Sequence, residues 1–286
     1  MTEQERDRVI EKVAGCLVTA GSTFSEDKKN AYRRAIARET SEKAKWVLET
    51  ILENAEAAES SRGPLCDDTG IPHLFLEAGP DRAVTGSLLE AIREGVRQGL
   101  RALPGRPMAI RGEDAQRLDQ SGGLDADPAA LAPTPIVIKP VAEDVLRLHI
   151  LMFGGGPAIR GKTMRVFHKH SVDTVVDTIV EWSTEAVKAL GCSPCTLAVG
   201  IGRSQYEAAS LMLEAQVYGN FDEQSPLERT ITDRVNASGT GALGLGGDVS
   251  VIGTFLKVGP QRASGVRIVS LRPCCCFEPR IARVEL

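Results

Sequence analysis

The chain has 286 residues, with 34 basic and 38 acidic side chains, so its formal net charge is −4 at pH 7. No basic patch stands out, which argues against nucleic acid as a partner, and no apolar run approaches the ~20 residues that span a bilayer. The first eight residues are charged and no signal-peptide core follows them, so we expect a soluble cytoplasmic protein with no membrane partner. Seven cysteines are too few for a disulfide scaffold in a chain of this length; such cysteines are more often core residues, metal ligands or nucleophiles.

Helical periodicity dominates the first part of the chain, where apolar residues recur every three or four positions. Ser25, followed by two acidic residues, is a good helix start. Residues 112–133 are instead rich in Asp, Gly, Pro and Ala, which predicts a long irregular loop. The predicted helices cover residues 5–18, 40–60 and 83–101, with another beginning after Ser25.

The second part changes character, because short apolar runs bounded by Gly and Pro replace most of the helical pattern. One amphipathic helix is predicted over 172–190, and Gly191 closes it as a C-terminal cap. Gly259-Pro260 marks a turn between the last two predicted strands. The predicted strands cover residues 135–139, 145–153, 197–201, 248–258 and 266–271.

This order of elements predicts an α+β fold. Helices come first and strands follow with few helices between them, which disfavours a doubly wound parallel sheet. We therefore expect one domain over residues 1–286, with a helical part at 1–110 and mixed or antiparallel sheets in a strand-rich part at 134–286.

The run Pro64–Gly70 is the most informative stretch of the chain. Cys66, Asp67, Asp68, Thr69 and Gly70 place a thiol, two carboxylates, a hydroxyl and a glycine in consecutive positions. A polar turn of this kind is costly to order unless something binds there. A thiolate can hold iron or zinc, and an adjacent carboxylate can move a proton. The alternative is an ordinary Asp-Thr-Gly turn that happens to contain a cysteine.

Two further cysteine groups also lie at the ends of predicted elements, where thiolates can project toward a shared centre. Cys192 and Cys195 lie between a helix cap and a strand, and Cys274–Cys276 follow a strand. A structural zinc site would need two C-x2-C pairs, and only the first group has that spacing. Three separate cysteine loops suit an iron–sulfur cluster with one iron left without a protein ligand. Cys274–Cys276 could also be an apolar strand end with no ligand role.

Two glycine motifs compete with this interpretation. Gly156–Thr163 matches the phosphate-loop pattern G-x-x-x-x-G-K-[ST] and follows a strand. However, no apolar strand ends in an Asp suited to magnesium, and the residues after Thr163 are a poor start to a helix. Gly239–Gly244 matches G-x-G-x-x-G but follows no buried strand, so we expect no dinucleotide site. His168 and His170 are expected to be surface residues.

With these motifs in place, the chain resembles the α subunit, or N-terminal half, of the iron–sulfur hydro-lyases, the family of class I fumarase and L-tartrate dehydratase. The likeness covers nearly the whole chain, and its short motifs occur in the family's order. It is carried by the helix 44–56 leading to Pro64–Gly70, by Gly154–Gly156, by Gly191–Pro194 with Val199–Gly202, by Gly244–Gly247, and by the last strand, its cysteines and Arg280.

The resemblance implies a [4Fe–4S] cluster held by three cysteine thiolates, with the fourth iron binding substrate. Cys66 and Cys192 match two of the ligands. The third lies in 274–276: counting forward along the last strand gives Cys274, and counting back from Arg280 gives Cys276. We take Cys276, with Cys274 as the alternative.

The resemblance also implies the residues that act on substrate. Asp68 matches the family's catalytic aspartate, and Asp67 is a second candidate beside it. Arg106 falls where the family has an arginine that grips a substrate carboxylate. Gly155 and Gly156 match a loop whose backbone approaches the substrate.

Several residues depart from the family pattern in the region that would contact the substrate. Asp67 replaces a glutamine, Phe153 stands where a lysine is common, and Arg262 falls where a histidine is usual. The triple glycine continues as Pro157–Arg160 in place of Ser, an acidic residue and Asn, and the region 112–133 lacks the common Asn/Thr-rich pattern.

These observations predict the cluster-bearing α subunit of a reversible hydro-lyase that acts on a small hydroxy-carboxylic acid of the fumarate/malate or tartrate type. Asp68 is the acid–base candidate, and Arg106 is the carboxylate clamp. The family's other active-site half lies in a β subunit, so a partner chain and an α2β2 heteromer are expected. The alternatives are a repurposed homologue with another substrate or a structural cluster, and a nucleotide-binding protein that uses Gly156–Thr163.

Overall fold

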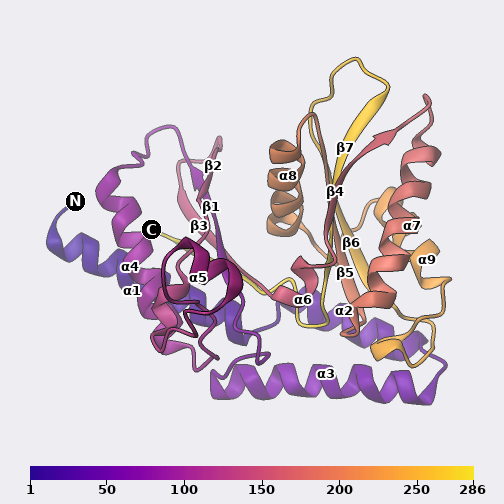
Figure 1. Ribbon diagram of the computed structural model, residues 1–286, viewed down its shortest axis with the longest axis horizontal. Coiled ribbons are helices and arrows are strands. Elements are labelled where there is room, and N and C mark those ends of the chain that lie inside the picture. The colour runs from indigo at the N-terminus through magenta and orange to yellow at the C-terminus, as the bar shows by residue number, and fades with distance from the viewer. The chain divides into compact units, whose positions relative to one another are not determined.

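The computed structural model describes residues 1–286, and the chain divides into two compact units (Figure 1). The first unit comprises Met1–Phe24, Ala55–Gly154 and Arg280–Leu286, and the second comprises Ser25–Asn54 and Gly155–Pro279. Helix α3 (Glu42–Ser61) begins in the second unit and ends in the first. Because each unit is assembled from segments far apart in the sequence, the sequence shows no linker at which to divide the chain.

The first unit is a four-stranded sheet with the spatial order β2-β1-β3-β8. The central strand β1 pairs in parallel with β2 and antiparallel with β3, and β3 pairs antiparallel with β8. Two helices pack against this sheet, and the loop before β2 carries only a short helix and a 3₁₀ turn. The elements are α1 (Glu3–Ser22), β1 (Ile71–Ala78), α4 (Gly86–Ala102), α5 (Asp114–Asp119), η1 (Pro128–Leu131), β2 (Val137–Pro140), β3 (Leu146–Phe153) and β8 (Ile281–Glu285).

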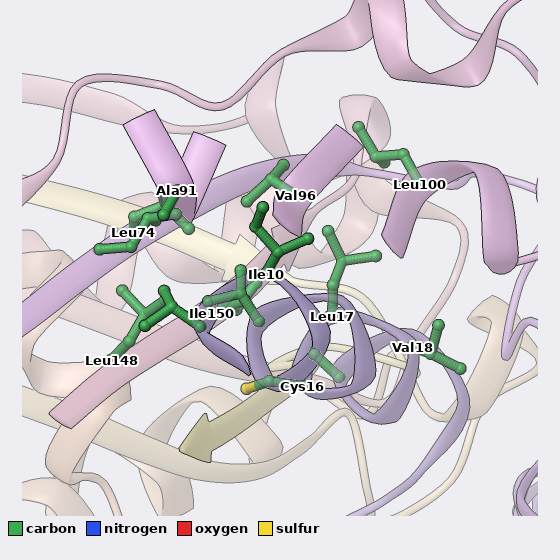
Figure 2. Close-up of a cluster of buried hydrophobic side chains, with 14 of the residues drawn as sticks. Ile10, Cys16, Leu17, Val18, Leu74, Ala91, Val96, Leu100, Leu148 and Ile150 are labelled. Atoms are coloured by element: carbon green, nitrogen blue, oxygen red, sulfur yellow. The ribbon is translucent and has the colours of Figure 1, made fainter. Parts of the chain in front are cut away.

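The core of the first unit lies between the two helices and one face of this sheet, as Figure 2 shows. Leu17 of α1 and Val96 of α4 are fully buried there, together with Leu148 and Ile150 of β3. The helical residues recur at steps of three and four, and the strand residues at steps of two, so each element directs one face inward. The periodicity that predicted α1 and α4 is therefore the same feature that builds this core.

The second unit is another four-stranded sheet, with the order β4-β7-β5-β6. Strand β5 pairs in parallel with β6 and antiparallel with β7, which pairs antiparallel with β4. Helix α8 lies on one face of this sheet, and α7 and α9 lie on the other (Figure 1). The elements are α2 (Glu26–Arg38), α6 (Gly155–Ala158), β4 (Lys162–Phe167), α7 (Val172–Leu190), β5 (Cys195–Gly202), α8 (Gln205–Tyr218), α9 (Pro226–Asn236), η2 (Ala242–Gly244), β6 (Val251–Val258) and β7 (Val266–Cys274).

The α+β class is confirmed by these two mixed sheets and the helices around them. Strand β1 lies inside the predicted helical part at 1–110. Its only apolar run is Leu74–Leu76, which is too short to distinguish a strand from a helix end. The strand-rich part also contains α8 and α9, which were not predicted. Apolar and polar side chains are poorly segregated around α8, so its pattern is weak. None of the helices is long and apolar enough to cross a membrane.

Truncating the core should destabilise the first unit. Leu17→Ala removes a fully buried side chain, and we expect it to lower the free energy of unfolding by about 2–5 kcal/mol in urea titrations. Leu118→Ala is the control, because this leucine is 89% exposed and its loss should change the value by less than about 0.5 kcal/mol. Equal effects of the two substitutions would contradict the core described here.

Candidate active site

Strands β1, β3 and β8 of the first unit have termini at the same end of their sheet. The start of β1 lies beside the end of β3, with Ile71 opposite Phe153, and the start of β8 lies beside the same strand, with Ile281 opposite Leu151. The segment Pro64–Gly70, here called the Cys66 loop, leads directly into β1, and Arg280 directly precedes β8. The sheet register therefore brings these two segments to the same place.

Arg280 holds the Cys66 loop to the end of β3. Its side chain is buried, at 3% exposure, and its Nη1 donates to the carbonyl oxygens of Asp68 at 2.7 Å and Thr69 at 3.2 Å. Its Nε donates to the carbonyl of Met152 at 3.2 Å. Buried carbonyls need partners, and one guanidinium supplies donors for all three in a fixed plane. The backbone of the loop is therefore fixed by a side chain from the other end of the sequence.

The turn itself is built from Asp68, Thr69 and Gly70. The backbone N–H of Gly70 donates to Oδ1 of Asp68 at 3.1 Å, which orients that carboxylate. Gly70 has φ +84°, and a Cβ there would lie 2.4 Å from Nη2 of Arg280, so only glycine fits. Thr69 is buried, and its hydroxyl donates to the carbonyl of Arg106 at 2.6 Å. This bond places the Arg106 segment beside the loop.

The predicted site residues of the first unit come together around this turn. Cys66 is partly exposed, and its thiol donates to Oδ1 of Asp67 at 3.4 Å. Nη1 of Arg106 lies 3.7 Å from Oδ2 of Asp67, and both side chains are largely exposed. Asp68 is half-buried next to them. A thiol, two carboxylates and a guanidinium are thus presented from a backbone that is itself fixed.

His73 is a residue of this region that the sequence analysis missed. Its ring stacks on Phe153 with centroids 4.1 Å apart, and its Nδ1 lies 3.0 Å from the carbonyl oxygen of Ile71. Phe153 therefore forms a stacked aromatic pair with the imidazole of His73 beside the start of β1.

In the second unit, Cys192 and Cys276 lie side by side. The backbone N–H of Cys276 donates to the carbonyl of Cys192 at 2.9 Å. The Cys192 side chain is exposed and Cys276 is buried, and the carbonyl of Cys276 accepts a hydrogen bond from the hydroxyl of Tyr32 at 2.7 Å. A hydrogen bond with Cys275, together with burial, raises the pKa of the Cys276 thiol well above its usual value. Two of the predicted ligands are therefore neighbours.

Of the remaining cysteines, Cys16, Cys195 and Cys274 are buried and Cys275 is partly exposed. Cys274 is the last residue of β7, and its buried thiol donates to Oε1 of Gln216 at 3.4 Å. Cys275 packs against the apolar core of the second unit, of which Cys195 is a buried member. Burial raises the pKa of Cys274 and of Cys195, and raises that of Cys16 in the first unit to about 12. The contacts of these cysteines are with other residues of the protein interior.

Buried charges surround the segment Cys274–Cys276. Lys28 of α2 is only 1% exposed; burial lowers its pKa to about 8, and the neighbouring cysteines and Glu278 oppose that decrease. The carboxylate of Glu278 is fully buried and receives two hydrogen bonds from Nη2 of Arg272, at 2.9 and 3.1 Å. The sequence analysis missed Lys28. Its position on the register of the buried residues Ala31, Tyr32 and Ala35 was the available signal.

The glycine segment Gly156–Thr163 does not form the geometry of a phosphate loop. Gly155 and Gly156 lie in the four-residue helix α6, whereas Lys162 and Thr163 begin strand β4. Nζ of Lys162 lies 3.0 Å from Glu185, and the hydroxyl of Thr163 lies 2.9 Å from that of Ser270. In a nucleotide loop the Lys and Thr would lie at the start of a helix. No contact here favours the nucleotide alternative.

The three predicted cluster ligands belong to different units: Cys66 to the first, and Cys192 and Cys276 to the second. No group of three or more His, Cys, Asp or Glu side chains is arranged to hold a single metal ion. In a four-iron cluster each thiolate binds a different iron, so its ligands need not converge on one point.

Comparison with known proteins identifies the family. The model of the fumarate hydratase (fumerase) family matches residues 10–285, and the chain therefore belongs to this family of hydro-lyases. It is 26% identical over 272 residues to a protein of Methanocaldococcus jannaschii provisionally named L(+)-tartrate dehydratase subunit alpha, covering 91% of this chain and 92% of that protein. It is 24% identical over 293 residues to the L(+)-tartrate dehydratase subunit alpha of Escherichia coli strain UTI89, covering 99% and 93% of the two chains.

The environments of the cysteines predict which thiols react. Alkylation of the native chain at pH 8 should modify Cys192, Cys66 and Cys275 first, because Cys192 is exposed and the other two are partly exposed. Cys16, with a pKa of about 12, stays protonated at pH 8 and should react more than about 100-fold slower. Mass spectrometry of the labelled peptides measures the order, and all seven cysteines should react in denaturant. Rapid native labelling of Cys16 or Cys195 would contradict this assignment.

Proposed function

We propose that this chain is the cluster-bearing α subunit of a hydro-lyase that adds water to, or removes it from, a small hydroxy-carboxylic acid. The observation that carries the proposal is the Cys66 loop: Arg280 and Thr69 fix its backbone, while Cys66, Asp68 and the neighbouring Arg106 stay accessible. Membership of the fumarate hydratase family supports the reaction class.

Cys66, Cys192 and Cys276 are the proposed ligands of a [4Fe–4S] cluster. Their thiol chemistry suits iron, and the exposure of Cys192 with the adjacent backbone of Cys276 supports this choice. Cys274 is the less suitable third ligand, because its thiol is directed toward Gln216 in the interior. When bound, the cluster would supply a Lewis-acidic iron that polarises the substrate hydroxyl and carboxylate.

Arg106 is the proposed carboxylate clamp of this chain. Its planar guanidinium can hold a carboxylate through two parallel hydrogen bonds. In the free chain it lies near the carboxylate of Asp67, so a substrate carboxylate would compete with Asp67 for it. Asp67 stands where the family usually has a neutral glutamine. Because Asp67 competes with the substrate carboxylate for Arg106, substrates that form further polar contacts with the site would bind more tightly.

Asp68 is the proposed acid–base group. Dehydration of a 2-hydroxy acid breaks a C–H bond at the carbon next to the hydroxyl-bearing carbon and expels the hydroxyl, so the products are water and an unsaturated acid. A carboxylate held in place can accept the C–H proton, and in the reverse direction it returns this proton. The Asp68 carboxylate is oriented by a hydrogen bond from the backbone N–H of Gly70, and the Asp68 carbonyl is held by a hydrogen bond from Arg280. Asp67 is the second candidate for this role.

Gly155 and Gly156 are proposed to let the backbone approach the substrate. Apart from its own helix and chain neighbours, no atom lies within 4 Å of a Cβ built on Gly156, so the space beside this backbone is open. A ligand could therefore approach the backbone closely there.

A β subunit is the proposed partner, because the relatives described above are named as alpha subunits. Their names also make tartrate, beside fumarate and malate, the first substrate to test. We expect an α2β2 assembly in the cytoplasm.

Cysteine substitutions test the ligand set. The anaerobically reconstituted chain should bind about four irons, and Cys66→Ala, Cys192→Ala and Cys276→Ala should each lose most of them. Cys16→Ala, Cys195→Ala and Cys274→Ala are the matched controls and should keep the iron, because these thiols are core residues. Iron and sulfide assays with the absorption spectrum give the result. Full iron in both Cys66→Ala and Cys192→Ala would rule out the proposed cluster.

Substitution of Asp68 tests the proton-transfer role. Asp68→Asn keeps the shape and removes the basic carboxylate, so turnover in the presence of the β subunit should fall about 10²–10⁴-fold with unchanged iron content. Asp67→Asn is the neighbouring control, and it should change the KM for the substrate more than kcat, because it frees Arg106. Near-normal turnover of Asp68→Asn would indicate that the acid–base group is Asp67 or a residue of the partner chain.

A further inference from the structure

A pocket of about 210 Å³ lies in the second unit, between the helices α7 and α9 and the sheet face that they cover (Figure 1). Nine of its ten lining residues are Val, Leu or Ile, and the tenth is Arg267. Ile179 and Ile231 are buried at its floor, whereas Val172 and Val258 are 67% and 51% exposed at its rim. Aliphatic side chains offer water no hydrogen bonds, so an apolar group that replaces water there is stabilised.

The pocket lies at the end of this sheet that is opposite to the cysteines. Strands β5 and β7 are antiparallel, so Cys274 at the end of β7 lies beside the start of β5, whereas Ile268 near the start of β7 lies beside Gly202. Ile201 and Arg267, which line the pocket, belong to this second end. The hydroxyl groups of the proposed substrate would find no hydrogen-bond partners among aliphatic side chains. The pocket is therefore suited to a different class of ligand.

Arg267 gives this apolar pocket one positive charge. Its Nη1 donates to the backbone carbonyls of Val266 at 3.0 Å and Ser264 at 3.1 Å, which holds the side chain in place. No group of the chain accepts a hydrogen bond from its Nε or Nη2, and the guanidinium forms no ion pair. Helices α7 and α9 begin at the same end, and the acidic residues of their first turns, Asp173 and Glu228, do not line the pocket. An anionic head group would therefore find a counter-charge and free donors at Arg267.

We propose that this pocket binds an unbranched aliphatic carboxylate of about six to eight carbons, with its chain among the aliphatic side chains and its carboxylate at Arg267. A cavity of about 150 Å³ with a similar lining stays dry and holds one benzene molecule, so a pocket of 210 Å³ has room for about eight carbons. The planar guanidinium matches a carboxylate in shape and charge. The inference goes beyond the proposed function, because it needs neither a cluster nor a β subunit.

Isothermal titration calorimetry of the full chain with octanoate tests the proposal. We expect a dissociation constant of about 1 mM or lower, and binding about fourfold weaker for each methylene removed toward hexanoate and butanoate, because each buried methylene contributes about this factor. Arg267→Gln should weaken octanoate binding about 10-fold or more by removing the charge-assisted hydrogen bonds, and should leave the binding of octan-1-ol unchanged. Arg165→Gln is the matched control, because this arginine is exposed on the neighbouring strand β4 and does not line the pocket.

If Arg267→Gln does not fold, Val175→Phe replaces it: this change fills the pocket from α7 and should abolish octanoate binding. Octanoate binding that is absent in the wild type, or that is equal in the wild type and in either variant, would overturn the proposal. Equal weakening by Arg165→Gln would overturn it too, by reducing the effect to surface charge. Loss of octanoate binding on addition of the β subunit would instead make the pocket part of a subunit interface, and would also overturn it. None of these measurements depends on iron content or turnover, so the proposed function is tested separately.

Discussion

The buried guanidinium of Arg280 is the interaction on which the candidate site depends. It donates to the carbonyls of Asp68 and Thr69 in one segment and of Met152 in another, and all three lie far from it in the sequence. An arginine stays protonated under ordinary conditions, so these donors are permanent, and buried carbonyls without them would be costly. The loop that carries Cys66 and Asp68 is therefore rigid in its backbone, although its acidic side chains face solvent.

In the second unit the end of strand β7 separates three adjacent cysteines by environment. Cys274, the last strand residue, is directed toward Gln216 of α8, and Cys275 packs against the apolar core. Cys276 lies beyond the strand and is tied by its backbone to Cys192. Cys276 is thus bonded through its backbone to the exposed Cys192, although its own side chain is buried, like that of Cys274, whereas Cys275 is partly exposed.

Charge is distributed differently in the two units. In the first unit Asp67 and Arg106 are exposed, and water screens their attraction. In the second unit Lys28, Arg272 and Glu278 are buried, where screening by water is weak.

The amino-acid sequence by itself determined the α+β class, the helices α1, α3, α4 and α7, and the strands β2, β3, β5, β6 and β7, because hydrophobic periodicity and glycine or proline boundaries are local properties. It also picked out Cys66, Asp68, Arg106 and Cys192 through short motifs. It missed strand β1, in which Pro72, His73 and Glu77 interrupt the apolar residues, and the short strands β4 and β8, in which at most one side chain is buried. It could not choose between Cys274 and Cys276, because counting along the chain does not show which side chain the strand turns inward.

Only the tertiary structure decided the remaining features, and each depends on a contact between distant segments. Sheet pairing of β8 with β3 brings Arg280 to the Cys66 loop, and the bond from Thr69 brings Arg106 to the same place. The packing of α2 places Lys28 and Tyr32 against Cys276. Local patterns encode which face of an element is buried, but not which partner buries it, and the division into two interleaved units follows from those partners.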